Sequence, residues 1–198
     1  MDKPRIGIII SSTRQARFGE RAARWIHTIG SQRRDLDFEV VDLRDYPLPF
    51  FDGISPLHAP VTDADAVRWG TKMSELDGYL FVTAEYNRSI TGVLKNALDW
   101  AYREYNRKPA AYLGYGGVGG ARAIEQLRLI CIELQMAPTR TGVHITGADA
   151  AALIFQGKSF DELELPHLTT SAHAMLDELA WWAAALKRAR AVPAISDA

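Results

Sequence analysis

The chain has 198 residues, of which 47% are hydrophobic and 24% charged, so it is long enough to bury the sizeable core of one globular domain over residues 1–198. Its 23 Lys and Arg nearly balance its 24 Asp and Glu. With a net charge near zero, the protein has no overall electrostatic attraction for nucleic acid or for a membrane surface. Because the lone Cys131 has no partner for an internal disulfide, and no signal segment or long apolar span appears, we expect a cytoplasmic protein.

Short apolar runs that suit strands alternate with helical patterns along the chain. The expected strands are residues 5–11, 38–43, 78–83, 110–114 and 142–146. The expected helices are residues 19–29, 64–76, 93–105, 121–134 and 168–190. Such alternation is typical of a parallel sheet covered on both faces. Two long connections, 46–60 and 147–166, interrupt the pattern, and connections of this length are often functional or interfacial.

The loop "SSTRQARFG", residues 11–19, leaves the first expected strand and leads into a helix. It offers three hydroxyls, two guanidinium groups and the N–H groups of the helix N-terminus, from Ser11, Ser12, Thr13, Arg14 and Arg17. These donors suit a phosphate. The loop lacks the G-x-x-x-x-G-K-[ST] pattern of P-loop enzymes, so magnesium-triphosphate chemistry is not indicated. The loop alone leaves a second interpretation open, in which the hydroxyls only cap the helix and the arginines face water.

A glycine-rich loop follows the fourth expected strand, and residues 114–119, "GYGGVG", satisfy G-x-G-x-x-G. A dinucleotide-binding fold places that motif in its first βα turn and needs an acidic residue at the end of the next strand. Here the next strand ends in His144-Ile145-Thr146-Gly147. A Rossmann-type site is therefore not expected, although glycines without a Cβ would let the backbone approach a flat ring.

The segment "TAEYNRSITGVLKNALDW", residues 83–100, resembles the E-Y-N-x-S-x-x-G-x-L-K-N-A-L/I-D-W signature of the NAD(P)H-dependent FMN reductase family, flavodoxin-like proteins that include quinone, azo-dye and chromate reductases. Residues 11–19 resemble the phosphate loop of that family, and residues 114–128 resemble its third flavin-contacting loop. The resemblance covers residues 5–145. It implies a flavodoxin-like three-layer α/β sandwich, with a five-stranded parallel sheet of order 2-1-3-4-5 and helices on both faces.

The chain departs from the family pattern at four positions. The family more often has Gly at Ser11, Pro at Ala84 and Thr91, and Ser at Gly114. The last difference leaves only backbone for a flavin contact at Gly114.

The resemblance implies an FMN-containing oxidoreductase with NADPH or NADH as donor, and a flavin, quinone, azo compound or metal oxyanion as acceptor. Residues 12–19 would surround the FMN phosphate, residues 84–87 would lie along the isoalloxazine, and residues 114–117 would approach its far edge. The residues expected to bind the cofactor are Ser11, Ser12, Thr13, Arg14, Arg17, Phe18, Gly19, Ala84, Glu85, Tyr86, Asn87, Gly114, Tyr115, Gly116 and Gly117.

No catalytic side chain is assigned, because FMN itself carries hydride chemistry. The five histidines are scattered without metal-ligand spacing, so no metal site is expected. Cys131 lies in an apolar helical segment and is expected to be a core residue. Tyr86 either stacks on substrate or only packs its loop. Arg122 either contacts nicotinamide phosphates or a partner subunit, or anchors the glycine loop. Glu85 is expected to face solvent or a subunit contact.

Family resemblance also implies a dimer or a tetramer, because the helix after the signature usually packs against another subunit. The aromatic residues Trp100, Tyr102, Tyr105, Trp181 and Trp182 are candidates for such an interface or for the core. The favoured function is a ping-pong NAD(P)H oxidoreductase. A flavodoxin-type electron carrier is the alternative, although carriers tend to be strongly acidic. A response receiver would need acidic residues where Ser11 to Thr13 stand.

Overall fold

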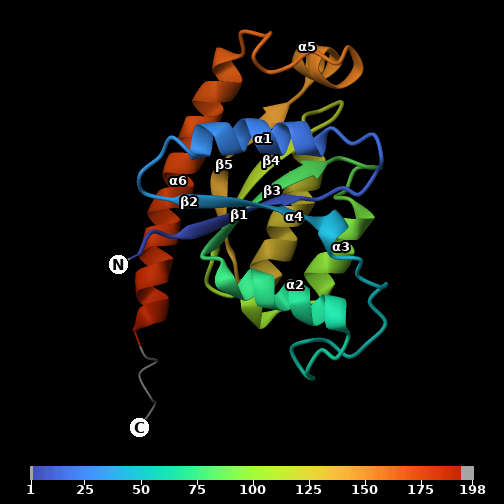
Figure 1. Cartoon of the computed structure of the whole chain (residues 1–198), viewed down its shortest axis with the longest axis vertical. Coiled ribbons are helices and arrows are strands. Elements are labelled where there is room, and N and C mark those ends of the chain that lie inside the picture. The colour runs from blue at the N-terminus through green and yellow to red at the C-terminus, as the bar shows by residue number, and fades with distance from the viewer. Residues whose placement is uncertain (1, 193–198) are drawn as a thin grey trace.

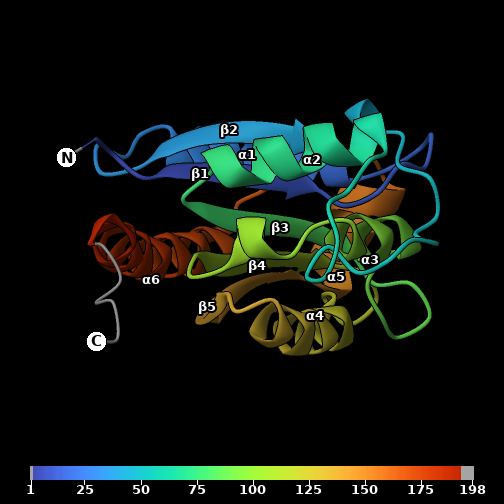
Figure 2. The same ribbon diagram turned by 90° about the horizontal axis from the view of Figure 1, so that it is seen from below.

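The computed structural model describes residues 2–192; Met1 and residues 193–198, which the sequence assigns to the same domain, lie outside the described part. Five parallel strands form one sheet in the order β2-β1-β3-β4-β5 (Figure 2). The strands are β1 (Arg5–Ile10), β2 (Asp37–Asp42), β3 (Gly78–Ala84), β4 (Pro109–Tyr115) and β5 (Ala137–Ile145). The predicted strand order and the flavodoxin-like fold class are confirmed.

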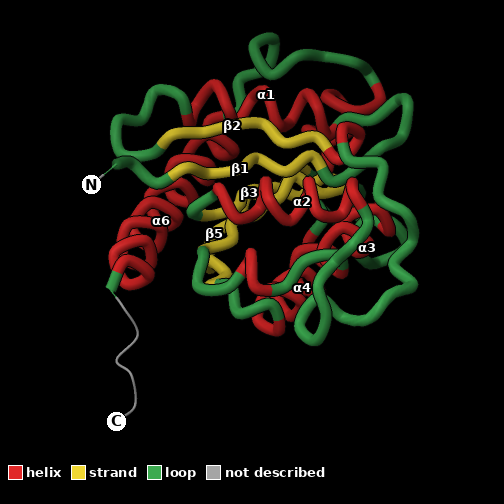
Figure 3. Tube along the Cα trace, turned by 60° about the horizontal axis from the view of Figure 1, so that its bottom comes forward, coloured by secondary structure: helices red, strands yellow, loops and turns green. Residues whose placement is uncertain are grey.

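Helices cover both faces of the sheet and give the molecule three layers (Figures 1 and 3). They are α1 (Gly19–Gly30), α2 (Ala64–Glu75), α3 (Gly92–Asp99), α4 (Ala121–Glu133), α5 (Gly147–Ala150) and α6 (Pro166–Ala191). Side chains of β1 alternate between two cores, with Ile8 packed among residues of α1 and α6, and Ile9 among residues of α2, α3 and α4. Among the described helices, none combines the length and apolarity that a bilayer crossing requires.

Two elements differ from expectation by more than two residues, and one expected connection contains helix. β5 begins at Ala137, five residues early, because its first half is a partly exposed polar stretch of an edge strand without an apolar run. The helix expected over 93–105 ends at Asp99, and a separate 3₁₀ turn follows at Arg103–Tyr105. Part of the long connection 147–166 is helical, because α5 continues into a π-helical turn, Ala151–Phe155.

The aromatic residues considered for a subunit interface or the core divide between core and surface. Trp100 is buried and its Nε1 donates to the Pro49 carbonyl at 2.8 Å. Tyr105 is buried, and its hydroxyl accepts from Trp69 Nε1 at 2.9 Å. Both therefore pack inside the protomer, whereas Trp181 on α6 is 65% exposed. The prediction that Cys131 lies in the core is confirmed.

Candidate active site

Three loops meet at the carboxyl edge of the sheet, where β1, β3 and β4 end side by side. The first two loops touch, because the Thr91 hydroxyl donates to the Ser11 carbonyl and the Arg14 guanidinium lies 5.7 Å from the centre of the Tyr86 ring. The second and third loops are linked where Glu85 N–H donates to the Tyr115 carbonyl at 3.2 Å. The structure thus brings together the three segments that the sequence singled out.

In the first loop, the two serines have different surroundings. Ser11 Oγ donates to the Val82 carbonyl at 2.7 Å and so ties the loop to β3. Ser12 is 1% exposed, and within residues 2–192 its Oγ has no hydrogen-bond partner. A buried hydroxyl without a partner is costly in a protein interior. Ser12 Oγ is therefore a donor that a ligand can satisfy.

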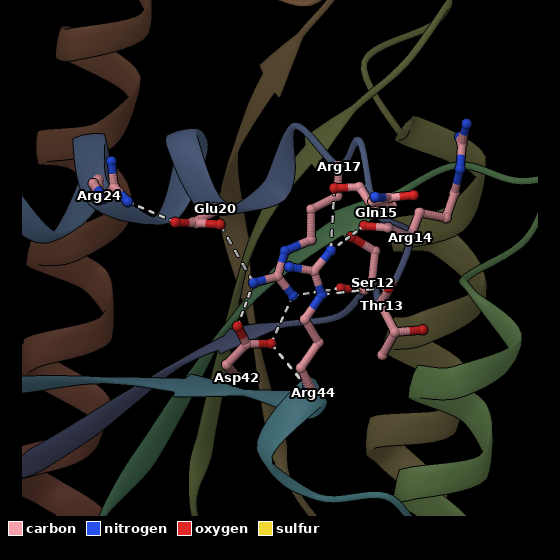
Figure 4. Close-up of polar contacts among 9 residues, drawn as sticks. All are labelled: Ser12, Thr13, Arg14, Gln15, Arg17, Glu20, Arg24, Asp42 and Arg44. Atoms are coloured by element: carbon pink, nitrogen blue, oxygen red, sulfur yellow. Dashed lines mark hydrogen bonds and ion pairs between the residues drawn. The ribbon is translucent and has the colours of Figure 1, made fainter.

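The two arginines of this loop point in different directions (Figure 4). The Arg17 side chain is only 3% exposed, and its Nη1 donates to Asp42 Oδ1 at 2.6 Å and to the Ser12 carbonyl at 2.7 Å. Arg14 extends away from Asp42, and within the described residues its guanidinium makes no hydrogen bond or ion pair. The two Nη atoms of Arg17 are therefore committed to the protein, and only its buried Nε has no partner among the described residues. The Arg14 guanidinium is available to meet an anion.

Asp42 at the end of β2 holds Arg17 from behind the loop. Burial by itself raises the pKa of Asp42, but hydrogen bonds from Arg17 and from the Arg44 N–H bring that pKa below its ordinary value. Asp42 is therefore ionised at neutral pH and pairs with Arg17 as a carboxylate.

Phe18 and Gly19 close the first loop by packing. The Phe18 ring meets the Tyr115 ring edge to face, with 5.1 Å between the ring centres. A Cβ placed on Gly19 would lie 2.9 Å from the Tyr115 hydroxyl. Phe18 therefore packs on Tyr115 of the third loop, and the lack of a side chain at Gly19 lets the two loops approach closely.

The second loop is a tight turn. Tyr86 N–H donates to the Ser89 carbonyl at 3.0 Å and Ser89 N–H donates back at 3.1 Å. Between them, Asn87 and Arg88 both have positive φ, 50° and 70°, as a type I′ turn requires. Thr91, where the family more often has Pro, accepts from Leu94 N–H at 3.2 Å and so caps α3. Ala84 is buried at the end of β3.

Glu85 does not face solvent, contrary to that part of the expectation. Its side chain is 5% exposed, and its Oε1 accepts from Arg122 Nε at 2.5 Å. Its Oε2 accepts from the Arg122 N–H at 3.2 Å, at the first turn of α4. Of the interpretations considered for Arg122, the contacts of the protomer support anchoring of the glycine loop.

The glycines of the third loop serve two different purposes. Gly119 has φ 65°, and a Cβ on Gly114 would lie 2.6 Å from the Gly119 carbonyl, so these two residues pack the loop onto β4. Gly114 is thus buried beneath the loop rather than at its surface. By contrast, a Cβ on Gly117 would meet no atom within 4 Å, and one on Gly116 would be no nearer than 3.6 Å to Glu85. Gly116 and Gly117 form the open side of the loop.

Residues 4–150 match the family model described as NADPH-dependent FMN reductase. The chain belongs to this family. An FMN reductase of this kind is an oxidoreductase that uses FMN and NAD(P)H. The chain is 37% identical over 141 residues to an NAD(P)H-dependent FMN reductase of Schizosaccharomyces pombe, covering 69% of this chain and 70% of the relative. It is 34% identical over 143 residues to a 2-hydroxy-1,4-benzoquinone reductase of a Burkholderia species, covering 67% and 72% respectively.

The fold of this FMN reductase is similar to a solved flavoenzyme, the NAD(P)H:acceptor oxidoreductase FerB of Paracoccus denitrificans. The TM-score is 0.68 at 24% sequence identity, over 89% of this chain and 97% of the other.

FMN fits the site that the three loops of this FMN reductase form. Among the described residues, the buried Ser12 Oγ and the Arg14 guanidinium have no hydrogen-bond partner, which suits the phosphate end of FMN. The open side of Gly116 and Gly117 leaves room for the edge of a flat ring.

Two residues near this site were missed by the sequence reasoning, Asp42 and Arg44. The signal that could have found them is the strand order. Because β2 neighbours β1 in a 2-1-3-4-5 sheet, residues at the end of β2 lie beside the loop that follows β1.

Proposed function

We propose that the protein uses FMN held by its three loops to oxidise NAD(P)H and reduce small electrophilic acceptors, flavins or quinones, in a ping-pong cycle. Bound FMN supplies the hydride chemistry, and the protein binds and orients the ring. The observation that carries this proposal is the buried Ser12 Oγ and, in the same loop, the Arg14 guanidinium, which have no hydrogen-bond partner among residues 2–192, in a chain of the FMN reductase family.

The residues of the three loops divide the binding task in this proposal. Ser12, Thr13 and Arg14 hold the phosphate, while Ser11, Arg17, Phe18 and Gly19 set the shape of the loop through their protein contacts. The segment 84–87 lies along the ring, with the Glu85 carboxylate bound to Arg122. Gly116 and Gly117 border the far edge, supported by Gly114 and Tyr115 beneath them.

The acceptor class rests on the relatives. Besides the Burkholderia enzyme, an Arabidopsis thaliana relative named NADPH:quinone oxidoreductase is 39% identical over 106 residues, covering 51% of this chain and 52% of that protein. Quinones are therefore the first acceptors to test; azo compounds and metal oxyanions stay predictions. Comparing kcat/KM for NADPH and NADH with one quinone as acceptor decides the donor preference.

A ping-pong cycle has a distinct kinetic signature. When the initial rate is measured against donor at several fixed acceptor concentrations, double-reciprocal plots should be parallel, because the first product leaves before the acceptor binds. Intersecting plots would mean that donor and acceptor occupy the site together, and would overturn this part of the proposal.

A dimer or tetramer and a cytoplasmic location belong to the same proposal. The assembly is proposed from family resemblance, and Trp100 and Tyr105 have no part in it because they are buried within the protomer. Light scattering at micromolar concentration tests it, and a monomer would remove it.

A further inference from the structure

Four consecutive carbonyl oxygens of the first loop are bound by two guanidinium groups behind it (Figure 4). Arg17 Nη1 donates to the Ser12 carbonyl at 2.7 Å. Arg44 Nε donates to the Thr13 carbonyl at 3.4 Å, and Arg44 Nη2 donates to the Arg14 carbonyl and, at 3.3 Å, to that of Gln15. The carbonyl side of residues 12–15 thus faces the protein's own cations.

This arrangement determines where the N–H groups point. Because a trans peptide unit is planar, the carbonyl of one residue and the N–H of the next point in opposite directions. Carbonyls 12–15 are held toward Arg17 and Arg44, so N–H groups 13–16 face the other side of the loop. Within residues 2–192 these four N–H groups donate to no protein acceptor. Successive free N–H groups on one side of a loop form a binding site for an anion.

Asp42 binds the guanidinium group of Arg17 and the backbone N–H of Arg44. Its two carboxylate oxygens accept from the two Nη atoms of Arg17, and Oδ1 also accepts from the Arg44 N–H at 2.9 Å. The second contact caps the 3₁₀ turn at Leu43–Asp45, from which the Arg44 side chain extends. Glu20 lies 3.6 Å from Arg17, but it is 41% exposed and also pairs with Arg24 at 2.5 Å.

We propose that Asp42 is a positioning residue for phosphate binding: through Arg17 and Arg44 it turns the backbone N–H groups of residues 13–16 toward the FMN phosphate. Asp42 itself lies behind the loop and does not touch the cofactor. This inference rests on the proposed function, because it assigns the FMN phosphate to this loop.

The test compares FMN with riboflavin, which has the same ring but no phosphate. In Asp42→Asn the side chain keeps its size but loses the charge and one acceptor for Arg17. We expect the Kd for FMN to rise by about tenfold or more, while the Kd for riboflavin changes by less than about twofold. At saturating FMN, kcat should return close to the wild-type value. The exposed Arg44→Gln should show the same selective loss, and it keeps the test valid if Asp42→Asn folds poorly.

Glu39→Gln provides the matched control. Glu39 lies on the same strand and pairs with Arg5 at 3.2 Å and Lys72 at 3.4 Å, without contact to the loop, so its loss should leave both dissociation constants unchanged. Equal weakening of FMN and riboflavin in both test variants would show general damage to the site and overturn the inference, as would an unchanged Kd for FMN. The proposed function is tested separately, by the Kd values of the wild-type protein for FMN and riboflavin. If the wild type binds the two equally tightly, the proposed phosphate site itself is wrong.

Discussion

Glu85 and Arg122 join the second loop to the first turn of α4, with 2.5 Å between Glu85 Oε1 and Arg122 Nε. The carboxylate is almost fully buried, while the guanidinium is 39% exposed. Removing one partner of such a pair costs most when a buried charge is left behind.

Arg122→Ala should therefore destabilise the protein more than Glu85→Gln does. Because the Arg122 guanidinium is partly exposed to solvent, we expect a loss of about 1 to 3 kcal/mol for Arg122→Ala and a smaller loss for Glu85→Gln, measured by urea unfolding. The KM for NADPH should change little in Arg122→Ala. A KM raised tenfold or more at unchanged stability would instead assign Arg122 to the nicotinamide nucleotide.

Arg14→Ala should weaken FMN binding without changing the chemistry. A charge-assisted hydrogen bond to phosphate contributes about 1.5 to 3 kcal/mol, which corresponds to roughly a ten- to hundredfold rise in the Kd. We expect protein purified largely free of flavin, whose kcat recovers when excess FMN is added.

Arg24→Ala is the control for this prediction, because Arg24 is an exposed arginine of α1 that pairs only with Glu20 among the described residues. An unchanged FMN Kd in Arg14→Ala would show that Arg14 does not hold the phosphate. A kcat that stays low at saturating FMN would show that the loop shapes the reaction itself.

Cys131 should resist thiol reagents in the native protein. It is fully buried, and burial raises the pKa of its thiol to about 12. Because the thiolate is the reactive form, Ellman's reagent near pH 8 should react with Cys131 only after unfolding. A rapid reaction of the native protein would contradict the buried placement.

Lys108 should make stability depend on pH in the alkaline range. It is 6% exposed, and its Nζ donates to the Met73 carbonyl at 2.7 Å. Burial, with a smaller contribution from Arg190, lowers its pKa to about 8, against 10.5 for an unperturbed lysine. Between these values the unfolded chain binds more protons than the native one, so the free energy of unfolding rises with pH.

Lys108→Met isolates this contribution. The stability of the wild type relative to Lys108→Met should increase by about 1 to 3 kcal/mol from about pH 7 to about pH 9.5, because one pKa unit corresponds to about 1.4 kcal/mol. A stability difference that is the same at both pH values would contradict the lowered pKa.

The sequence predicts the centre of the sheet and the meeting of the three loops well, for a physical reason. β1 and β3 are buried on both faces, so their sequences are continuous apolar runs that indicate strands. In an alternating α/β chain these strands are parallel, so their carboxyl ends lie at the same edge of the sheet. The first half of β5 could not be found in this way, because an edge strand needs fewer apolar residues.

The roles of individual charges could not be predicted to the same degree. Arg14 and Arg17 have the same side chain in the same loop. Among the described residues, however, only Arg17 binds a carboxylate, that of Asp42, which lies 25 residues further along the chain at the end of β2. Likewise, the partner of Glu85 lies 37 residues along the chain. Such pairings depend on the packed sheet and on directions of side chains that local sequence does not determine.

Anaerobic titration of the purified protein with NADPH and NADH tests the central claim most directly. The account predicts a yellow protein whose visible flavin absorbance is lost on addition of at least one of the two nucleotides and restored by a quinone. Bound flavin that neither nucleotide reduces would contradict it and favour an electron carrier, and a protein that binds no FMN would contradict the site itself.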